Sequence, residues 1–164
     1  MPAIVRFRLD PAAVRELGAL RARLSTAGLP AAAGVPDVTV AAAGTIPRPA
    51  RDALVAELRL VALPALWLAT LGSRTGDDDA LVLAAVTDPE VLAVHTAVHD
   101  ALAGRVRGAH AAHLPGSWLP HVVLATGRPA EAFTLLHPAP PVRAGIVAVE
   151  LHDSRTGETT VLAP

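Results

Sequence analysis

The segment Trp118–Gly127, with the sequence WLPHVVLATG, determines how we interpret the rest of the chain. Its side chains alternate between two faces, and it is rich in Val and Leu. Gly127 and the nearby Pro129 are residue types that commonly end a strand. The segment therefore predicts a buried β-strand that carries one histidine, His121, among apolar neighbours.

The first half of the chain contains a similar segment. Residues Pro36–Ala41, with the sequence PDVTVA, again predict an apolar strand, but Asp37 stands where the later segment has His121. Two further pairs of motifs recur in the same order: Asp10-Pro11 and Asp88-Pro89 each open a helical stretch, and Ser-Arg-Thr-Gly follows a strand at residues 73–76 and 154–157. Three matching features in one order indicate an internal duplication.

The duplication predicts the fold class and the place of a site. We expect one α+β domain over residues 1–164, built from two lobes that consist mainly of residues 3–79 and 80–163. The predicted arrangement is bilobal and pseudo-twofold symmetric, with two antiparallel sheets around a central groove and helices on the outer faces. Equivalent strands meet at such an axis, so we expect Asp37 and His121 to face each other across the groove.

The composition excludes several classes of function. The chain has no cysteine, which removes disulfides and thiolate chemistry. Its net charge is −1, so no basic field is available to bind long nucleic acid. The N-terminus lacks the basic and apolar regions of a signal peptide, and no apolar stretch is long enough to span a bilayer. We therefore expect a cytoplasmic protein that does not enter membranes; the sequence does not indicate its oligomeric state.

The repeated pattern resembles the two-histidine phosphoesterase superfamily, which includes 2′-5′ RNA ligase-like proteins and cyclic nucleotide phosphodiesterases. Members have a duplicated bilobal α+β fold with one His-x-Thr/Ser motif in each lobe, and the segment Trp118–Ala125 is similar to the second motif. In this chemistry one imidazole removes a proton from the attacking group and the other protonates the leaving oxygen. The hydroxyl two residues later donates to the phosphoryl oxygens. The resemblance implies no metal and no cofactor.

The sequence departs from this pattern once in each motif. The first motif keeps Thr39 but has Asp37 in place of histidine, and the second keeps His121 but has Val123 in place of the hydroxyl residue. The resemblance thus implies His121, Thr39 and Asp37 as catalytic positions and Val123 as a substrate-contacting position. A core histidine is the alternative for His121; Asp37 is a pKa-shifted acid, an orienter of His121, or a relic of a lost site.

The predicted function follows from these departures. Loss of one proton-transfer partner costs about 10²–10⁴ in rate. We therefore expect at most a weak phosphodiesterase acting on a small nucleotide or an RNA-end phosphate, and it is uncertain that the protein is an enzyme. The alternative is an inactive relative that binds a nucleotide, another small anion or a protein partner in the same groove.

Three further residues are candidates for binding the substrate. Arg6 and Arg8 share one face of a predicted strand and could bind an anion, or they could be exposed charges on an edge strand. Trp67 could stack on a base or fill the core. His95 and His99 have a spacing that can hold a metal, but no third ligand is evident, so we expect no metal site.

Overall fold

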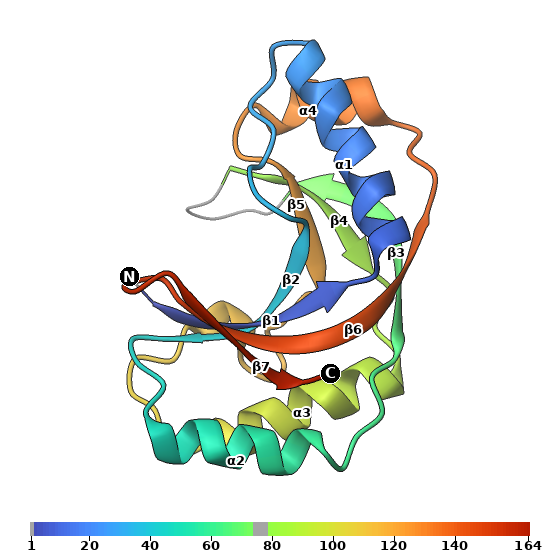
Figure 1. The fold of residues 1–164 in the computed structure, drawn as a ribbon. Coiled ribbons are helices and arrows are strands. Elements are labelled where there is room, and N and C mark those ends of the chain that lie inside the picture. Colours follow the sequence, from blue (N-terminus) through green and yellow to red (C-terminus); the bar gives the residue numbers. More distant parts are fainter. Residues whose placement is uncertain (1, 74–78) are drawn as a thin grey trace.

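The computed structural model describes residues 2–73 and 79–164 and contains seven strands and four α-helices (Figure 1). In chain order these are β1 (Ala3–Leu9), α1 (Pro11–Thr26), β2 (Asp37–Ala43), α2 (Arg48–Leu58), β3 (Ala65–Ser73), β4 (Leu81–Ala85), α3 (Pro89–Leu102), a short 3₁₀ helix η1 (Ala111–His113), β5 (His121–Ala125), α4 (Pro129–Leu136), β6 (Val142–Asp153) and β7 (Glu158–Ala163). The α+β class predicted from the sequence is confirmed.

The two predicted helix starts have the same capping geometry. Asp10 accepts a hydrogen bond from Ala13 N at 2.9 Å, and Asp88 accepts one from Val91 N at 2.9 Å. In both cases a proline occupies the first turn, where its missing N–H costs nothing. The repeated Asp-Pro motif is therefore a repeated helix N-terminus.

The strands form one connected antiparallel sheet, and not the two separate sheets that the sequence led us to expect. The strand order is β2-β1-β6-β3-β4-β5, and β7 also pairs with β6. The physical reason is the length of β6, which has 12 residues. Residues 142–145 of β6 pair with β3, while residues 146–153 pair with β1, so one strand joins both halves of the sheet.

The strand order is symmetric with respect to the two halves of the sequence. β1, β2 and β3 correspond to β4, β5 and β6, and each strand and its equivalent lie at the same distance from opposite ends of the order. A duplication would leave this order, and the duplication itself stays a prediction. Of the two Ser-Arg-Thr-Gly motifs, the second forms the β6–β7 turn, with Gly157 at a φ of +73°. Most of the first motif, residues 74–76, lies outside the described residues.

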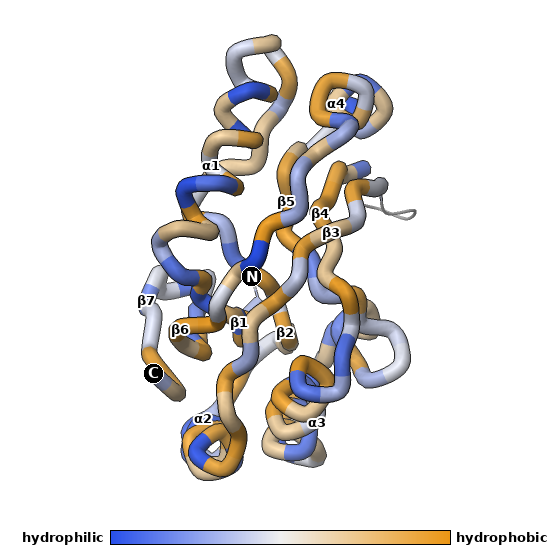
Figure 2. The backbone as a smooth tube through the Cα atoms, turned by 90° about the vertical axis from the view of Figure 1, so that its right-hand side faces the viewer, coloured by the Kyte–Doolittle hydropathy of each residue, from blue (hydrophilic) through white to orange (hydrophobic). Residues whose placement is uncertain are grey.

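The helices lie in two pairs around the sheet. Figure 2 shows α2 and α3 side by side at one end of the molecule and α1 and α4 at the other, each with alternating hydrophilic and hydrophobic segments. The apolar faces of these helices pack on the sheet, and Ala, Val and Leu supply nearly all of the buried core. The small number of aromatic residues is compatible with this core because stiff, branched side chains pack densely.

The connection that precedes β2 reaches across to β5. Ala32 N donates to Leu124 O at 2.8 Å, and Thr126 N donates to Pro30 O at 2.8 Å. The segment from Pro30 to Ala32 therefore runs along the last strand of the order and closes one side of the space between β2 and β5.

The connection that precedes β5 reaches across to β2 in a corresponding way. His110 N donates to Ala42 O at 2.8 Å, and the indole Nε1 of Trp118 donates to Thr39 O at 2.9 Å. The indole also stacks on the His95 ring, with centroids 4.1 Å apart. These contacts fix the loop that contains η1 against β2.

Candidate active site

The two motif strands meet at one pocket. β2 and β5 are the opposite ends of the strand order, but the curvature of the sheet brings them into contact (Figure 1). Asp37 and Thr39 from β2 and His121 and Val123 from β5 line a single cavity of about 470 Å³. The predicted meeting of positions 37 and 121 in one groove is confirmed, and their strands lie at the two ends of the strand order.

The position that the family resemblance assigns to a first histidine is occupied by a carboxylate in an ion pair. Oδ2 of Asp37 lies 3.1 Å from Nη1 of Arg6. Burial raises the pKa of the Asp37 carboxyl above its ordinary value, and the positive charges of Arg6 and Arg21 oppose this rise. Asp37 is therefore an acceptor held by a guanidinium, and its proton affinity is greater than that of an exposed aspartate.

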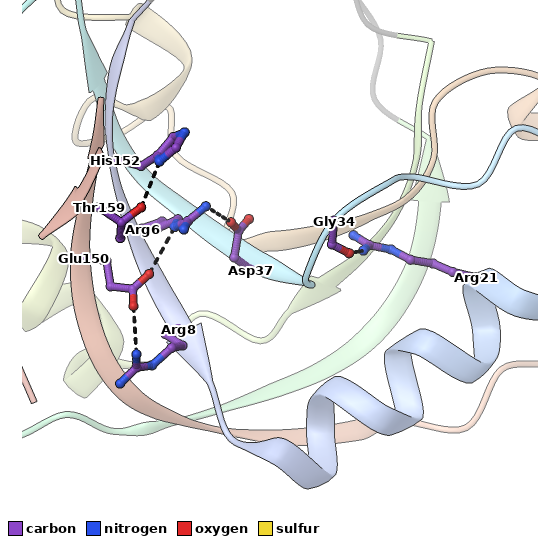
Figure 3. Close-up of polar contacts among 8 residues, drawn as sticks. All are labelled: Arg6, Arg8, Arg21, Gly34, Asp37, Glu150, His152 and Thr159. Atoms are coloured by element: carbon purple, nitrogen blue, oxygen red, sulfur yellow. Dashed lines mark hydrogen bonds and ion pairs between the residues drawn. The ribbon is translucent and has the colours of Figure 1, made fainter. Parts of the chain in front are cut away.

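Arg6 also contacts a second carboxylate, which the sequence analysis missed. Its Nε lies 3.3 Å from Oε2 of the buried Glu150, and Nη1 of Arg8 lies 3.0 Å from Oε1 (Figure 3). β1 pairs with β2 on one side and with β6 on the other, so the interpretation of Arg6 and Arg8 as charges on an edge strand is wrong. The only sequence signal for Glu150 is a carboxylate within the mainly apolar segment of β6, and its partner depends on strand register.

The two arginines lie differently with respect to the pocket. Arg6 lines the 470 Å³ cavity, whereas Arg8 lines an adjoining cavity of about 250 Å³ that shares Arg6 and Asp37 with it. The ion pair between Arg6 and Asp37 therefore stands between the two cavities.

His121 is half-buried at the pocket wall. Its Nδ1 lies 2.6 Å from the backbone oxygen of Leu119. A carbonyl only accepts, so Nδ1 carries the proton and Nε2 is the basic nitrogen of the neutral ring. This tautomer is the one that a general base needs, because Nε2 can then accept a proton.

Two pocket residues were not among the sequence candidates for catalysis or binding. Arg21 of α1 lines the cavity, and the signal that could have revealed it is a charged residue on the otherwise apolar face of a helix. His113 of η1 also lines the cavity, so the pocket contains a second imidazole besides His121.

Trp67 does not lie among the residues that line this pocket. It is on β3, where it pairs with Arg143 of β6, and it is 47% exposed. It therefore neither fills the core nor lies beside His121.

The helical histidine pair contacts the backbone. Nε2 of His95 lies 2.8 Å from His113 O, and Nε2 of His99 lies 3.2 Å from Val40 O. Both contacts fix the loop and β2 to α3. Within residues 2–73 and 79–164, no group of three or more His, Asp or Glu side chains is placed to hold a metal ion.

Comparison with known proteins supports the fold. The chain matches no protein-family model and no curated protein. Its structure is similar to the crystal structure of E. coli LigT in apo form, with a TM-score of 0.62 and 16% sequence identity, and the match covers 98% of this chain and 92% of LigT. LigT belongs to the two-histidine phosphoesterase superfamily. The α+β fold that the family resemblance predicted is thereby confirmed, and the internal duplication stays a prediction. In the part of the chain that the structure describes, no helix has the length and apolarity needed to cross a membrane.

Proposed function

We propose that this protein binds a small phosphate-bearing ligand, a nucleotide or an RNA end, in the pocket between β2 and β5. We further propose that it hydrolyses phosphodiesters weakly at most. The observation that carries the proposal is the meeting of Thr39, Asp37 and His121 in one cavity. The LigT-like fold supports it, because this cavity lies between the strands that hold the two motif positions.

Of the two imidazoles and two hydroxyls that the family resemblance implies, one imidazole and one hydroxyl are present at the motif positions. Nε2 of His121 can accept a proton, and the hydroxyl of Thr39 can donate to a phosphoryl oxygen. Asp37 is a poor replacement for an imidazole acid, because its carboxylate is paired with Arg6 at 3.1 Å. A negative charge at this position also repels a phosphodiester.

The ion pair between Arg6 and Asp37 favours a second candidate, a binding protein without catalysis. In this case the pocket binds a nucleotide or another small anion, and His121 is a ligand-contacting residue. We propose that the protein, whether it is a weak phosphodiesterase or a binding protein without catalysis, acts in the cytoplasm and needs no metal or cofactor. Dialysis against EDTA is therefore expected to leave ligand binding unchanged.

Calorimetric titration with 2′,3′-cyclic nucleotides, together with a hydrolysis assay on the same compounds, tests the proposal. We expect saturable binding that His121→Ala or Thr39→Ala weakens by about tenfold, as the loss of one hydrogen bond to a charged group predicts. His110→Ala is the matched control, because His110 lies in the same loop region but does not line the pocket. Failure of the wild-type protein to bind any of these nucleotides would contradict the proposal.

A further inference from the structure

Arg21 is a charged residue on the buried face of α1. Its neighbours on this face, Leu17, Leu20 and Leu24, belong to the core, and Arg21 itself is only 9% exposed. The guanidinium lines the pocket on the side opposite Arg6, with Asp37 between them (Figure 3). A buried charge at a pocket wall needs a partner.

The partners of Arg21 are neutral. Nε and Nη2 both donate to Val123 O, at 3.1 and 2.7 Å, and Nη1 donates to Gly34 O at 2.9 Å. A guanidinium has five N–H groups. In the part of the chain that the structure describes, three of them bind these carbonyls, so one N–H on each of Nη1 and Nη2 has no protein acceptor.

The acceptors do not compensate the charge. Burial lowers the pKa of the Arg21 guanidinium, and the nearby charge of Asp37 only partly opposes this. Asp37 is in contact with Arg6 and not with Arg21. The three arginines Arg6, Arg8 and Arg21 and the two carboxylates Asp37 and Glu150 of this region carry one net positive formal charge. An anion that entered it would regain for Arg21 part of the hydration energy that burial removed.

We propose that Arg21 is the anion-binding residue of this pocket and that it binds a phosphate oxygen of the ligand through Nη1 and Nη2. The inference deepens the proposed function and rests on it for the identity of the ligand. A planar guanidinium suits this role because two N–H groups can bind one oxyanion in a fixed geometry. Two carbonyls already hold the group in place, so little conformational entropy is lost on binding.

The location of Arg21 strengthens the assignment. Nε and Nη2 of Arg21 donate to the carbonyl oxygen of Val123. Val123 occupies the position at which the second motif of the family has a hydroxyl residue. The guanidinium therefore lies beside the place where a phosphoryl donor is lacking. Gly34, with a φ of +76°, supplies the other carbonyl from the connection that precedes β2.

Three variants and two probes test the assignment. Inorganic phosphate and a 2′,3′-cyclic nucleotide are titrated into wild-type protein, Arg21→Gln, Arg21→Lys and Arg23→Gln. Arg23 is the matched control, because it lies on the same helix, is exposed and donates to the carbonyl of Leu135. We expect Arg21→Gln to weaken phosphate binding by about tenfold or more, Arg21→Lys to restore part of it, and Arg23→Gln to leave it unchanged.

A second measurement covers the case in which Arg21→Gln does not fold. In wild-type protein, the NMR resonances of the Arg21 guanidinium should shift and exchange more slowly with water when phosphate saturates the pocket. Folded Arg21→Gln that binds phosphate as wild type does, or guanidinium resonances that stay unchanged at saturation, would overturn the inference. If phosphate binds through Arg21 and nucleotides do not bind, the inference stands and the proposed function fails. If neither probe binds, both fail.

Discussion

Arg6 and Arg21 line the same pocket, but they use their charge differently. Arg6 contacts two carboxylates, at 3.1 and 3.3 Å, whereas Arg21 contacts two backbone carbonyls. Arg6 is therefore neutralised by the protein, and Arg21 is not. The comparison shows that counting arginines around a pocket does not predict its affinity for anions; the charge of each partner decides it.

The difference arises from the elements that carry the two residues. β1 lies between β2 and β6, and its register places Arg6 opposite Glu150. Arg21 reaches the pocket from a helix whose buried face is otherwise apolar, and the groups within its reach are the carbonyls of Gly34 and Val123. Four changes test this comparison.

The largest effect is expected when Asp37 is replaced by the residue that the family resemblance implies. Asp37→His with Val123→Thr places an imidazole at the first motif position and a hydroxyl at the second, as the family resemblance implies. Hydrolysis of 2′,3′-cyclic nucleotides should rise by about 10² or more. His121→Ala in this background should abolish the gain. Brisk turnover by the natural protein that Asp37→Asn stops would show instead that Asp37 is a working catalytic group.

Removal of Arg6 should affect stability. Arg6→Gln leaves Asp37 and the buried Glu150 with less positive charge nearby, so the free energy of unfolding should fall by about 1–3 kcal/mol. Urea denaturation monitored by circular dichroism measures this change. An unchanged unfolding midpoint would mean that the contacts of Arg6 with Asp37 and Glu150 do not stabilise the fold.

Asp37→Asn should change the pH dependence of anion binding. The pKa of Asp37 is raised above its ordinary value of 3.8, and as pH falls through this raised pKa the carboxylate takes up a proton and the pocket becomes more positive. Wild-type affinity for sulfate, whose charge is constant in this range, should therefore increase toward low pH.

The asparagine variant lacks this titration. Its affinity for sulfate should be flat with pH and about tenfold higher than that of wild type at neutral pH, the order expected when one nearby unit charge is removed from a partly hydrated site. Calorimetric titrations at several pH values measure both effects. Parallel pH profiles for the two proteins would contradict the placement of Asp37 between the two guanidiniums.

Arg8→Gln should have the smallest effect. Its side chain is 49% exposed, and Arg6 still contacts the same carboxylate of Glu150. A loss of about 0.2–1 kcal/mol in the free energy of unfolding is expected, as for other exposed ion pairs. Its affinity for phosphate should not change, because Arg8 does not line the larger cavity. A loss of affinity equal to that of Arg21→Gln would place the anion beside Arg8.

Much of the fold could be predicted from local signals. The Asp-Pro pairs predicted two helix starts, and two apolar segments predicted the strands that carry Asp37 and His121. Both are local consequences of capping and of side-chain alternation. The joining of two predicted sheets into one could not be predicted in this way. It depends on which residues of β6 pair with β3 and which with β1, and this register is a tertiary property.

The same limit applies to the candidate site. The sequence indicated Arg6 as an anion-binding candidate, but not that Glu150 would neutralise it from another strand. Arg21 lies among the apolar positions of α1, and helical periodicity does not show what a buried side chain contacts. The sequence also left open whether Trp67 is exposed or buried, since alternation gives two faces of a strand without saying which one is covered.

The crossed connections described above have a consequence for self-association. β2 and β5 end the strand order, and an end strand with unpaired backbone groups invites a strand of another molecule to pair with it. In this fold, the connection before β2 binds β5, and the connection before β5 binds β2. Each half of the chain thus shields the open edge of the other, so that protection against intermolecular sheet growth depends on both halves being present.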